Sequence, residues 1–159
     1  MSSTIEPTSF QIKIKEEHVV KGIRTLNETF QTIGNVTNVD RRIVTIPASS
    51  SGAIGLINVN GINPGPGTFP SSSIKYIRIS NLDNATSLAV NFTSSDNGSG
   101  ASYWSMECTP TSSLIFSSPN VTGSAFDGTF GQDIEFITVY SLSSSIDVEY
   151  VVVNAQKIK

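Results

Sequence analysis

The sequence predicts an all-β protein: a two-sheet β-sandwich, of jelly-roll or immunoglobulin-like topology, with an N-terminal extended arm. Roughly eight short segments after residue 40 are rich in β-branched and aromatic residues and are separated by turn signals, which is typical of sandwiches. Charge also changes along the chain, because six of the ten basic residues lie in the first 42 positions. A highly charged extension, residues 1–42, therefore leads into a sparsely charged domain, residues 43–159.

The composition allows a folded core without covalent staples. The chain has 159 residues, of which 38% are hydrophobic and 14% are charged, and its net charge is −3. This length is typical of one domain. Ser, Thr, Asn and Gly replace charged residues, so we expect an uncharged polar surface. We recognise no secretory signal and no apolar run that would span a membrane. We expect a protein without a membrane partner that is made in the cytoplasm, or one from which a leader has been removed.

The extension contains one strand-like segment and one ambiguous segment. In residues 11–15 apolar and polar residues alternate strictly, which places Ile12 and Ile14 on one face of a strand. The partner sheet of this strand belongs either to its own domain or to a neighbouring subunit. Residues 19–30 are a candidate for a short helix, although their Thr, Asn and Gly content weakens helix propensity.

The closing segments of the domain show the clearest strand patterns. Residues 132–140 and 146–152 alternate and are joined by a serine-rich linker, which predicts a hairpin. Residues 62–70 are expected to form a long loop because three prolines remove backbone donors and fix φ. We expect another loop at residues 117–131. One face of the last strand is predicted to carry Ile146, Val148, Tyr150 and Val152.

No catalytic or metal-binding constellation is recognisable. The single cysteine, Cys108, and the single histidine, His18, are far apart in sequence, so a partly buried strand residue is a better interpretation of Cys108 than a nucleophile. Glu135, Asp147 and Glu149 alternate with apolar residues and are better explained as a solvated outer face than as cooperating carboxylates. The sequence therefore predicts a protein that is not an enzyme and has no cofactor or metal.

Binding signals are limited to one aromatic pair and the mixed-charge extension. Tyr103 and Trp104 follow an Asn-Gly turn, and an exposed aromatic pair on a sandwich can stack on a sugar ring. The interpretation that we favour places Trp104 in the core. The basic residues of the extension are matched by acidic neighbours, so little net field results and we expect no nucleic-acid partner.

Two pairs of segments carry a resemblance to a known group of proteins. Residues 74–83 (IKYIRISNLD) followed by 88–92 (LAVNF) form the first pair, and residues 134–140 (IEFITVY) followed by 146–152 (IDVEYVV) form the second. They resemble a strand pair and the closing hairpin of small virion proteins of tailed, particularly aquatic, bacteriophages. Residues 40–47 are similar to the segment that leads into the domain of those proteins.

The resemblance implies a non-enzymatic capsid cement or decoration protein, which is made in the host cytoplasm and stabilises the phage head from the capsid surface. Its partners would be the major capsid protein, copies of itself, or both, in a homo-oligomer for which a trimer is one option. The alternative is a tail, neck or fibre module that binds a host-surface glycan or receptor through Tyr103 and Trp104. In the first case the inter-subunit or capsid contacts are expected from Phe10, Ile12, Lys13, Ile14, Lys15, Arg41 and Arg42.

Overall fold

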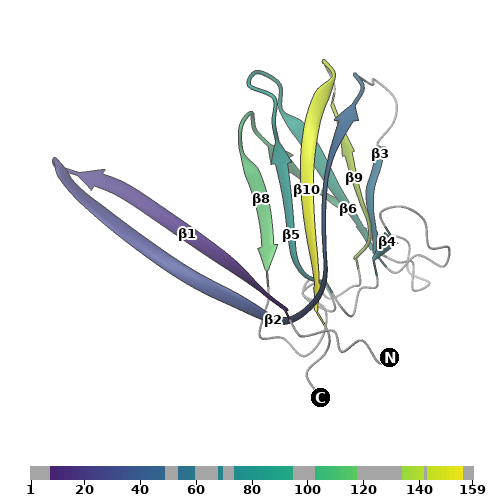
Figure 1. The fold of residues 1–159 in the computed structure, drawn as a ribbon. Coiled ribbons are helices and arrows are strands. Elements are labelled where there is room, and N and C mark those ends of the chain that lie inside the picture. Colours follow the sequence, from purple (N-terminus) through teal and green to yellow (C-terminus); the bar gives the residue numbers. More distant parts are fainter. Residues whose placement is uncertain are drawn as a thin grey trace, which may run out of the picture.

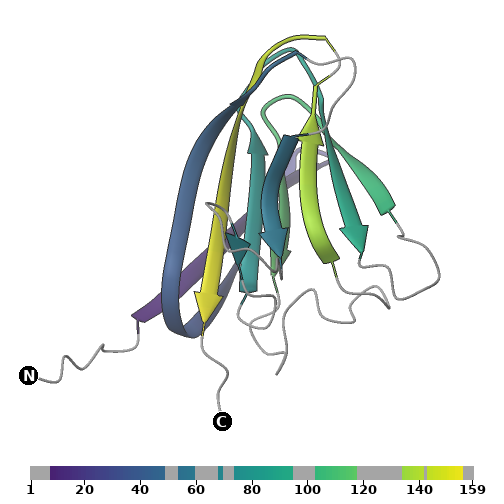
Figure 2. The same ribbon diagram turned by 90° about the vertical axis from the view of Figure 1, so that its right-hand side faces the viewer.

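The computed structural model is built from strands. It describes residues 8–48, 54–59, 68–69, 74–94, 103–117, 134–141 and 143–155. Within these ranges, ten strands form two five-stranded sheets (Figures 1 and 2). The predicted all-β class and the two sheets are therefore confirmed. Among the described residues, no helix is long and apolar enough to cross a membrane.

The first sheet is entirely antiparallel and has the strand order β1-β2-β10-β5-β8. In chain order its strands are β1 (Thr8–Val20), β2 (Ile23–Ile46), β5 (Ile74–Asn81), β8 (Ser113–Ser117) and β10 (Ile146–Ala155). The central strand β10 is buried at every position except Asp147. Its inner face meets the second sheet, and part of its outer face is covered by the beginning of β1 and the middle of β2.

The second sheet has the strand order β4-β3-β9-β6-β7. Its strands are β3 (Ile54–Val59), β4 (Thr68–Phe69), β6 (Leu88–Ser94), β7 (Tyr103–Cys108) and β9 (Ile134–Tyr140). β4 runs parallel to β3, and the other described neighbours are antiparallel. Thr68 and Phe69 thus form a short edge strand inside a segment for which the prolines predict a loop. The other residues of that segment lie outside the described part of the chain, as does most of the loop predicted after β8.

Apart from β1 and β4, the described strands pair in a nested order along the chain. β2 pairs with β10, β3 with β9, β5 with β8, and β6 with β7. The predicted hairpin between the last two strands is therefore wrong, because β9 and β10 lie in different sheets. The buried strand β10 needs a partner along each edge, and β2 and β5 provide these partners. The earlier segments 74–83 and 88–92 are likewise divided between the two sheets.

The main core lies between the two sheets. Burial of one such aliphatic or aromatic side chain contributes about 1.5–3 kcal/mol, so this cluster is the principal source of stability. The face predicted for the last strand is confirmed. The buried residues include Ile77, Ile79, Leu88, Val90, Phe92, Ile137, Val139, Ile146, Val148, Tyr150 and Val152.

A smaller cluster lies on the outer face of the first sheet. Ile12 and Ile33 pack there beside Val151 and Val153 of β10. Side chains alternate across a strand, so β10 supplies Ile146, Val148, Tyr150 and Val152 to the main core and Val151, Val153 and Ala155 to this second cluster. The base of the β1–β2 hairpin is thereby fixed to the sheet.

Beyond this base, the β1–β2 hairpin projects away from the sheets (Figure 1). The candidate helix at residues 19–30 is wrong, because these residues form the end of β1, a two-residue turn and the start of β2. Lys21 and Gly22 have φ values of 51° and 80°, and positive φ at both central residues is the mark of a type I′ hairpin turn. β2 continues without a break through residues 42 and 43, where the charge pattern places a domain boundary.

Candidate functional site

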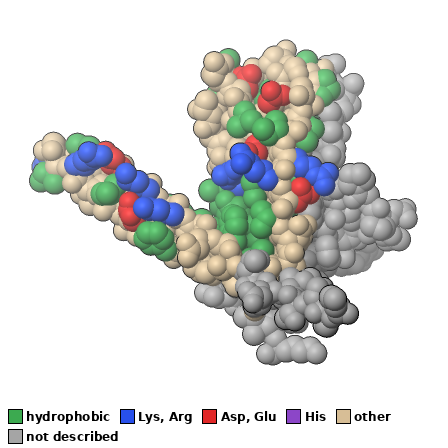
Figure 3. Space-filling model, in the orientation of Figure 1, with side chains coloured by type: hydrophobic (Ala, Val, Ile, Leu, Met, Phe, Trp, Pro, Cys, Tyr) green, Lys and Arg blue, Asp and Glu red, His purple; other side chains and the backbone are tan. Residues whose placement is uncertain are grey.

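The projecting hairpin exposes apolar side chains on both faces. The pairing register places Ile14, Val20 and Ile23 on one face and Val19, Leu26 and Phe30 on the other. Their exposed fractions range from 43% for Ile14 to 70% for Ile23. Figure 3 shows hydrophobic side chains on the hairpin and on the sheet beside it. Sequence reasoning misses Leu26 and Phe30 because it treats residues 19–30 as a candidate helix and does not recognise a hairpin there.

Ion pairs link the two strands of this hairpin. Lys13 Nζ lies 2.9 Å from a carboxylate oxygen of Glu28, and Arg24 lies 2.7 Å from Glu17. Lys13 Nζ is also 5.3 Å from the centre of the Phe30 ring. These side chains are largely exposed, so each pair contributes at most about 1 kcal/mol. Their main effect is to orient charged groups around an apolar surface.

The predicted contact residues of β1 have two different environments. Phe10 is half-buried, with its ring centre 5.2 Å from that of Tyr76, and Ile12 is buried in the second cluster. Both therefore hold the hairpin to its own sheet. Ile14 and Lys15 are exposed farther out, where Lys15 lies opposite Glu28. Together with Lys13, these two residues remain accessible to a partner.

The predicted contact residue Arg41 belongs to an ionic cluster on the outer face of the first sheet. Arg41 of β2 and Arg78 of β5 both pair with Glu149 of β10. The carboxylate side chain is only 8% exposed, whereas Arg41 is 68% exposed. The expectation of a solvated outer face is therefore wrong for Glu149, although Asp147 on the same face is exposed. Two neighbouring strands bring arginines over Glu149, which the pattern of β10 alone cannot reveal.

Arg42 points away from this cluster and pairs with Asp40 on its own strand. The guanidinium lies 2.9 Å from the carboxylate. Its hydrogen bond to Asp40 raises the pKa of Arg42, and the nearby Tyr150 hydroxyl acts in the same direction. Arg42 is thus an exposed cation with a local partner.

Trp104 packs onto the main core. Its ring stacks on Phe92 with the ring centres 3.9 Å apart, and the tryptophan is half-buried. The favoured interpretation of Trp104 as a packing residue agrees with this geometry. The side chain of Tyr103 lies outside the described part of the structure, so its role as a ligand contact stays a prediction.

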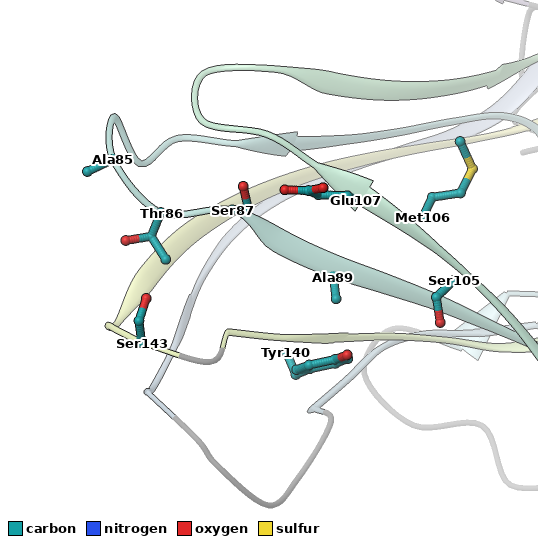
Figure 4. Close-up of a pocket in the computed structure, with 9 residues that line it drawn as sticks. All are labelled: Ala85, Thr86, Ser87, Ala89, Ser105, Met106, Glu107, Tyr140 and Ser143. Atoms are coloured by element: carbon teal, nitrogen blue, oxygen red, sulfur yellow. The ribbon is translucent and has the colours of Figure 1, made fainter.

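A pocket opens over the outer face of β6, β7 and β9 (Figure 4). It has a volume of about 480 Å³, within the range of roughly 300–1,000 Å³ typical of small-molecule sites. Tyr140, Ala89 and Glu107 form one row across three neighbouring strands, because Ala89 pairs with both of the others. Sequence reasoning misses this pocket, since its residues become neighbours only through the pairing of β6 with β7 and β9.

One wall of the pocket is held in place by Asp83. Its carboxylate accepts hydrogen bonds of 2.7 Å from the backbone amides of Ala85 and Thr86. These bonds favour the ionised form and lower the pKa of Asp83. The side chain of Asn81 donates to the carbonyl of Thr86 at 2.8 Å and to that of Cys108 at 3.1 Å. The wall is therefore tied to the sandwich from both sides.

Cys108 and the carboxylates form no recognised reaction centre or metal site in the described part of the chain. Cys108 is completely buried, with its sulfur 3.5 Å from the carbonyl oxygen of Ser112. Within the described ranges, no three His, Cys, Asp or Glu side chains are grouped closely enough to hold a metal ion. No protein-family model matches this chain, and no curated protein or solved structure matches it.

Proposed function

We propose that this protein is a non-enzymatic structural subunit of jelly-roll topology that assembles with other subunits through its β1–β2 hairpin. The nested pairing supports a jelly roll, in which the first strand pairs with the last and each inner pair lies within the previous one. An immunoglobulin-like sandwich joins its strands in a different order, with B next to E and C next to F. In this proposal the hairpin is the arm expected from the charge pattern.

The observation that carries the proposal is the exposure of six large apolar side chains on one projecting hairpin. Such a concentration of apolar surface on a monomer is typical of a protein interaction site. β1 is also an edge strand of the first sheet, so its outer edge can add to a strand of another subunit through backbone hydrogen bonds. Three apolar residues on each face allow the hairpin to be enclosed by partners on both sides.

The partner class that we propose is a virion shell. The resemblance of residues 74–92 and 134–152 in sequence to phage cement and decoration proteins supports it, although these segments do not form the strand pair and the hairpin that the resemblance implies. A rigid sandwich with a projecting hairpin suits a protein that links neighbouring shell subunits. The major capsid protein and further copies of this chain are the proposed partners. The proposed location is the capsid surface, after synthesis in the host cytoplasm. The alternative is a tail, neck or fibre module, for which the hairpin would be the attachment point to the particle.

The proposal is tested by shortening the hairpin while keeping its base. Removal of residues 1–42 is unsuitable, because it would take most of β2 away from β10. Replacing residues 13–30 by Asn-Gly keeps Phe10, Ile12 and Ile33. The new turn connects Ile12 to Gln31, which face each other across the hairpin in the same way as Val20 and Ile23 beside the native turn. Asn-Gly is the preferred sequence for such a turn. We expect a folded sandwich that no longer binds shells or copies of itself.

A point variant provides a second test without shortening the chain. Leu26→Thr with Phe30→Thr removes apolar surface from one hairpin face and retains residues that favour strands. We expect this variant to assemble at least tenfold more weakly in sedimentation and shell-binding measurements. The matched control is Thr25→Ser with Thr29→Ser on the opposite face, for which binding should be retained. Full binding by the Leu26/Phe30 variant and by the shortened protein would contradict the proposal.

The particle location is tested by quantitative mass spectrometry on purified virions. Many copies per particle, in simple proportion to the major shell protein, would support a cement or decoration role. A handful of copies would favour the tail, neck or fibre alternative. Absence from particles would overturn the virion proposal. The assembly role of the hairpin is tested separately by the binding measurements.

A further inference from the structure

We propose that the pocket over β6, β7 and β9 binds an uncharged hexopyranose, such as a sugar unit at the end of a glycan. This site is on the second sheet, whereas the hairpin extends from the first. The inference therefore does not depend on the assembly role.

The shape of the pocket follows from one row of residues across the sheet. The small side chain of Ala89 lies between those of Tyr140 and Glu107 (Figure 4). Neighbouring strands are about 4.8 Å apart, so the two larger residues are separated by roughly 10 Å along the row. The alanine leaves this interval open, with an aromatic ring on one side and a carboxylate on the other. A pyranose ring is of the right size to occupy it.

The chemistry of the walls matches the two kinds of surface on a sugar. The Tyr140 ring and the Ala89 methyl group offer apolar contact to the C–H face of a pyranose. Ser87 and Ser143 contribute hydroxyl groups to the pocket lining, and so do Thr86 and Ser105, whose hydroxyls are also hydrogen-bonded to Ser144 and Asn91 within the protein. A hydroxyl both donates and accepts hydrogen bonds, as does each hydroxyl of a sugar.

Glu107 supplies the strongest hydrogen-bond acceptor of the site. Its side chain is exposed at the pocket. Within the described part of the chain no cation lies within ion-pair distance of it. A carboxylate without a cation is available to accept from two adjacent sugar hydroxyls, and such charge-assisted hydrogen bonds are stronger than neutral ones.

Other ligand classes fit the same walls less well. Among the described residues that line the pocket there is no lysine or arginine, which disfavours phosphates and other anions. A hard cation would require several oxygen ligands with clustered carboxylates, whereas Glu107 is the single acidic residue in the described part of the lining. A cationic amine could approach Glu107 and the Tyr140 ring, but it would leave the surrounding hydroxyls without matched partners. An uncharged sugar uses the ring, the hydroxyls and the carboxylate together.

The binding experiment uses the full chain and four probes: the methyl glycosides of glucose, galactose, mannose and N-acetylglucosamine. Ligand-detected NMR and calorimetry at millimolar sugar concentration are expected to show binding of at least one. Glu107→Gln should weaken that binding about tenfold. Glu16→Gln on the hairpin is the matched control and should leave affinity unchanged. Tyr140→Phe should retain most affinity because it keeps the ring, whereas Tyr140→Ala should lose it.

The results distinguish a sugar site from a site for a cationic ligand. If Tyr140→Ala unfolds in a thermal denaturation measurement, Glu107→Gln and Tyr140→Phe still decide the question. Failure of all four glycosides to bind would overturn the inference, as would equal binding by wild type and Glu107→Gln. Tighter binding of choline than of every sugar would also overturn it in favour of a cationic ligand.

Discussion

The indole ring of Trp104 is nearly parallel to the ring of Phe92, with 8° between their planes and 3.9 Å between their centres. Phe92 is fully buried and also meets Phe116 edge-on at 5.2 Å. The three rings connect β6 and β7 of the second sheet with β8 of the first. Trp104 therefore joins two strands of one sheet and helps to hold the two sheets together.

We expect Trp104→Ala to lower the free energy of unfolding by about 2–4 kcal/mol, because the substitution removes a large ring from the core margin and one stacked aromatic pair. Trp104→Phe should cost less, since it keeps the stack. Urea denaturation followed by circular dichroism measures both values. A loss below about 0.5 kcal/mol for Trp104→Ala would show that the ring contributes little to packing.

The Glu149 carboxylate organises two arginines on the outer face of the first sheet. We expect Glu149→Gln to lower the free energy of unfolding by about 1–3 kcal/mol, because it leaves Arg41 and Arg78 without their shared partner. Glu17→Gln is the matched control, and loss of its exposed pair with Arg24 should cost at most about 1 kcal/mol. Equal effects of the two substitutions in chemical denaturation would contradict a special role for the buried carboxylate.

The hairpin turn depends on the backbone conformation of Gly22. At φ 80° an alanine would be strained, even though no atom lies within 4 Å of the position of an added Cβ. We expect Gly22→Ala to destabilise the end of the hairpin by about 1 kcal/mol. The measurement is amide hydrogen exchange at residues 16–28, where protection should decrease. Lys21→Asn is the control and should preserve protection, because asparagine accepts positive φ.

The loop at Asp83 should respond to acid. The pKa of Asp83 is lowered in the folded protein by the amides of Ala85 and Thr86, so its ionised form stabilises the fold. This contribution is fully present above the pKa of the unfolded chain and is lost as the pH falls through the lower folded-state pKa. We expect the stability difference between wild type and Asp83→Asn to shrink across that acidic interval. A difference that does not change with pH in denaturation experiments would contradict this assignment.

Strand-forming segments are predictable because the alternation of side chains is a local property. The last strand illustrates this, since the pattern assigns its even-numbered residues correctly to the core. The hairpin turn is missed because Lys21-Gly22 is a weaker turn signal than Asn-Gly. The burial of Glu149 is missed because arginines from two other strands cover it. The pocket is missed because Tyr140, Ala89 and Glu107 belong to three strands that become neighbours only when the sheet forms.

The sequence by itself determined that the chain is all-β, how its clearest strands alternate, and that its N-terminal part is rich in charge. Only the tertiary structure decided that β10 lies between β2 and β5, that β9 belongs to the other sheet, and that Ala89 opens a pocket. The physical reason is that a strand satisfies its backbone hydrogen bonds with partners far away in sequence. A strand pattern therefore specifies which side chains face inward, while pairing and the surfaces that it creates depend on the packing of the whole chain.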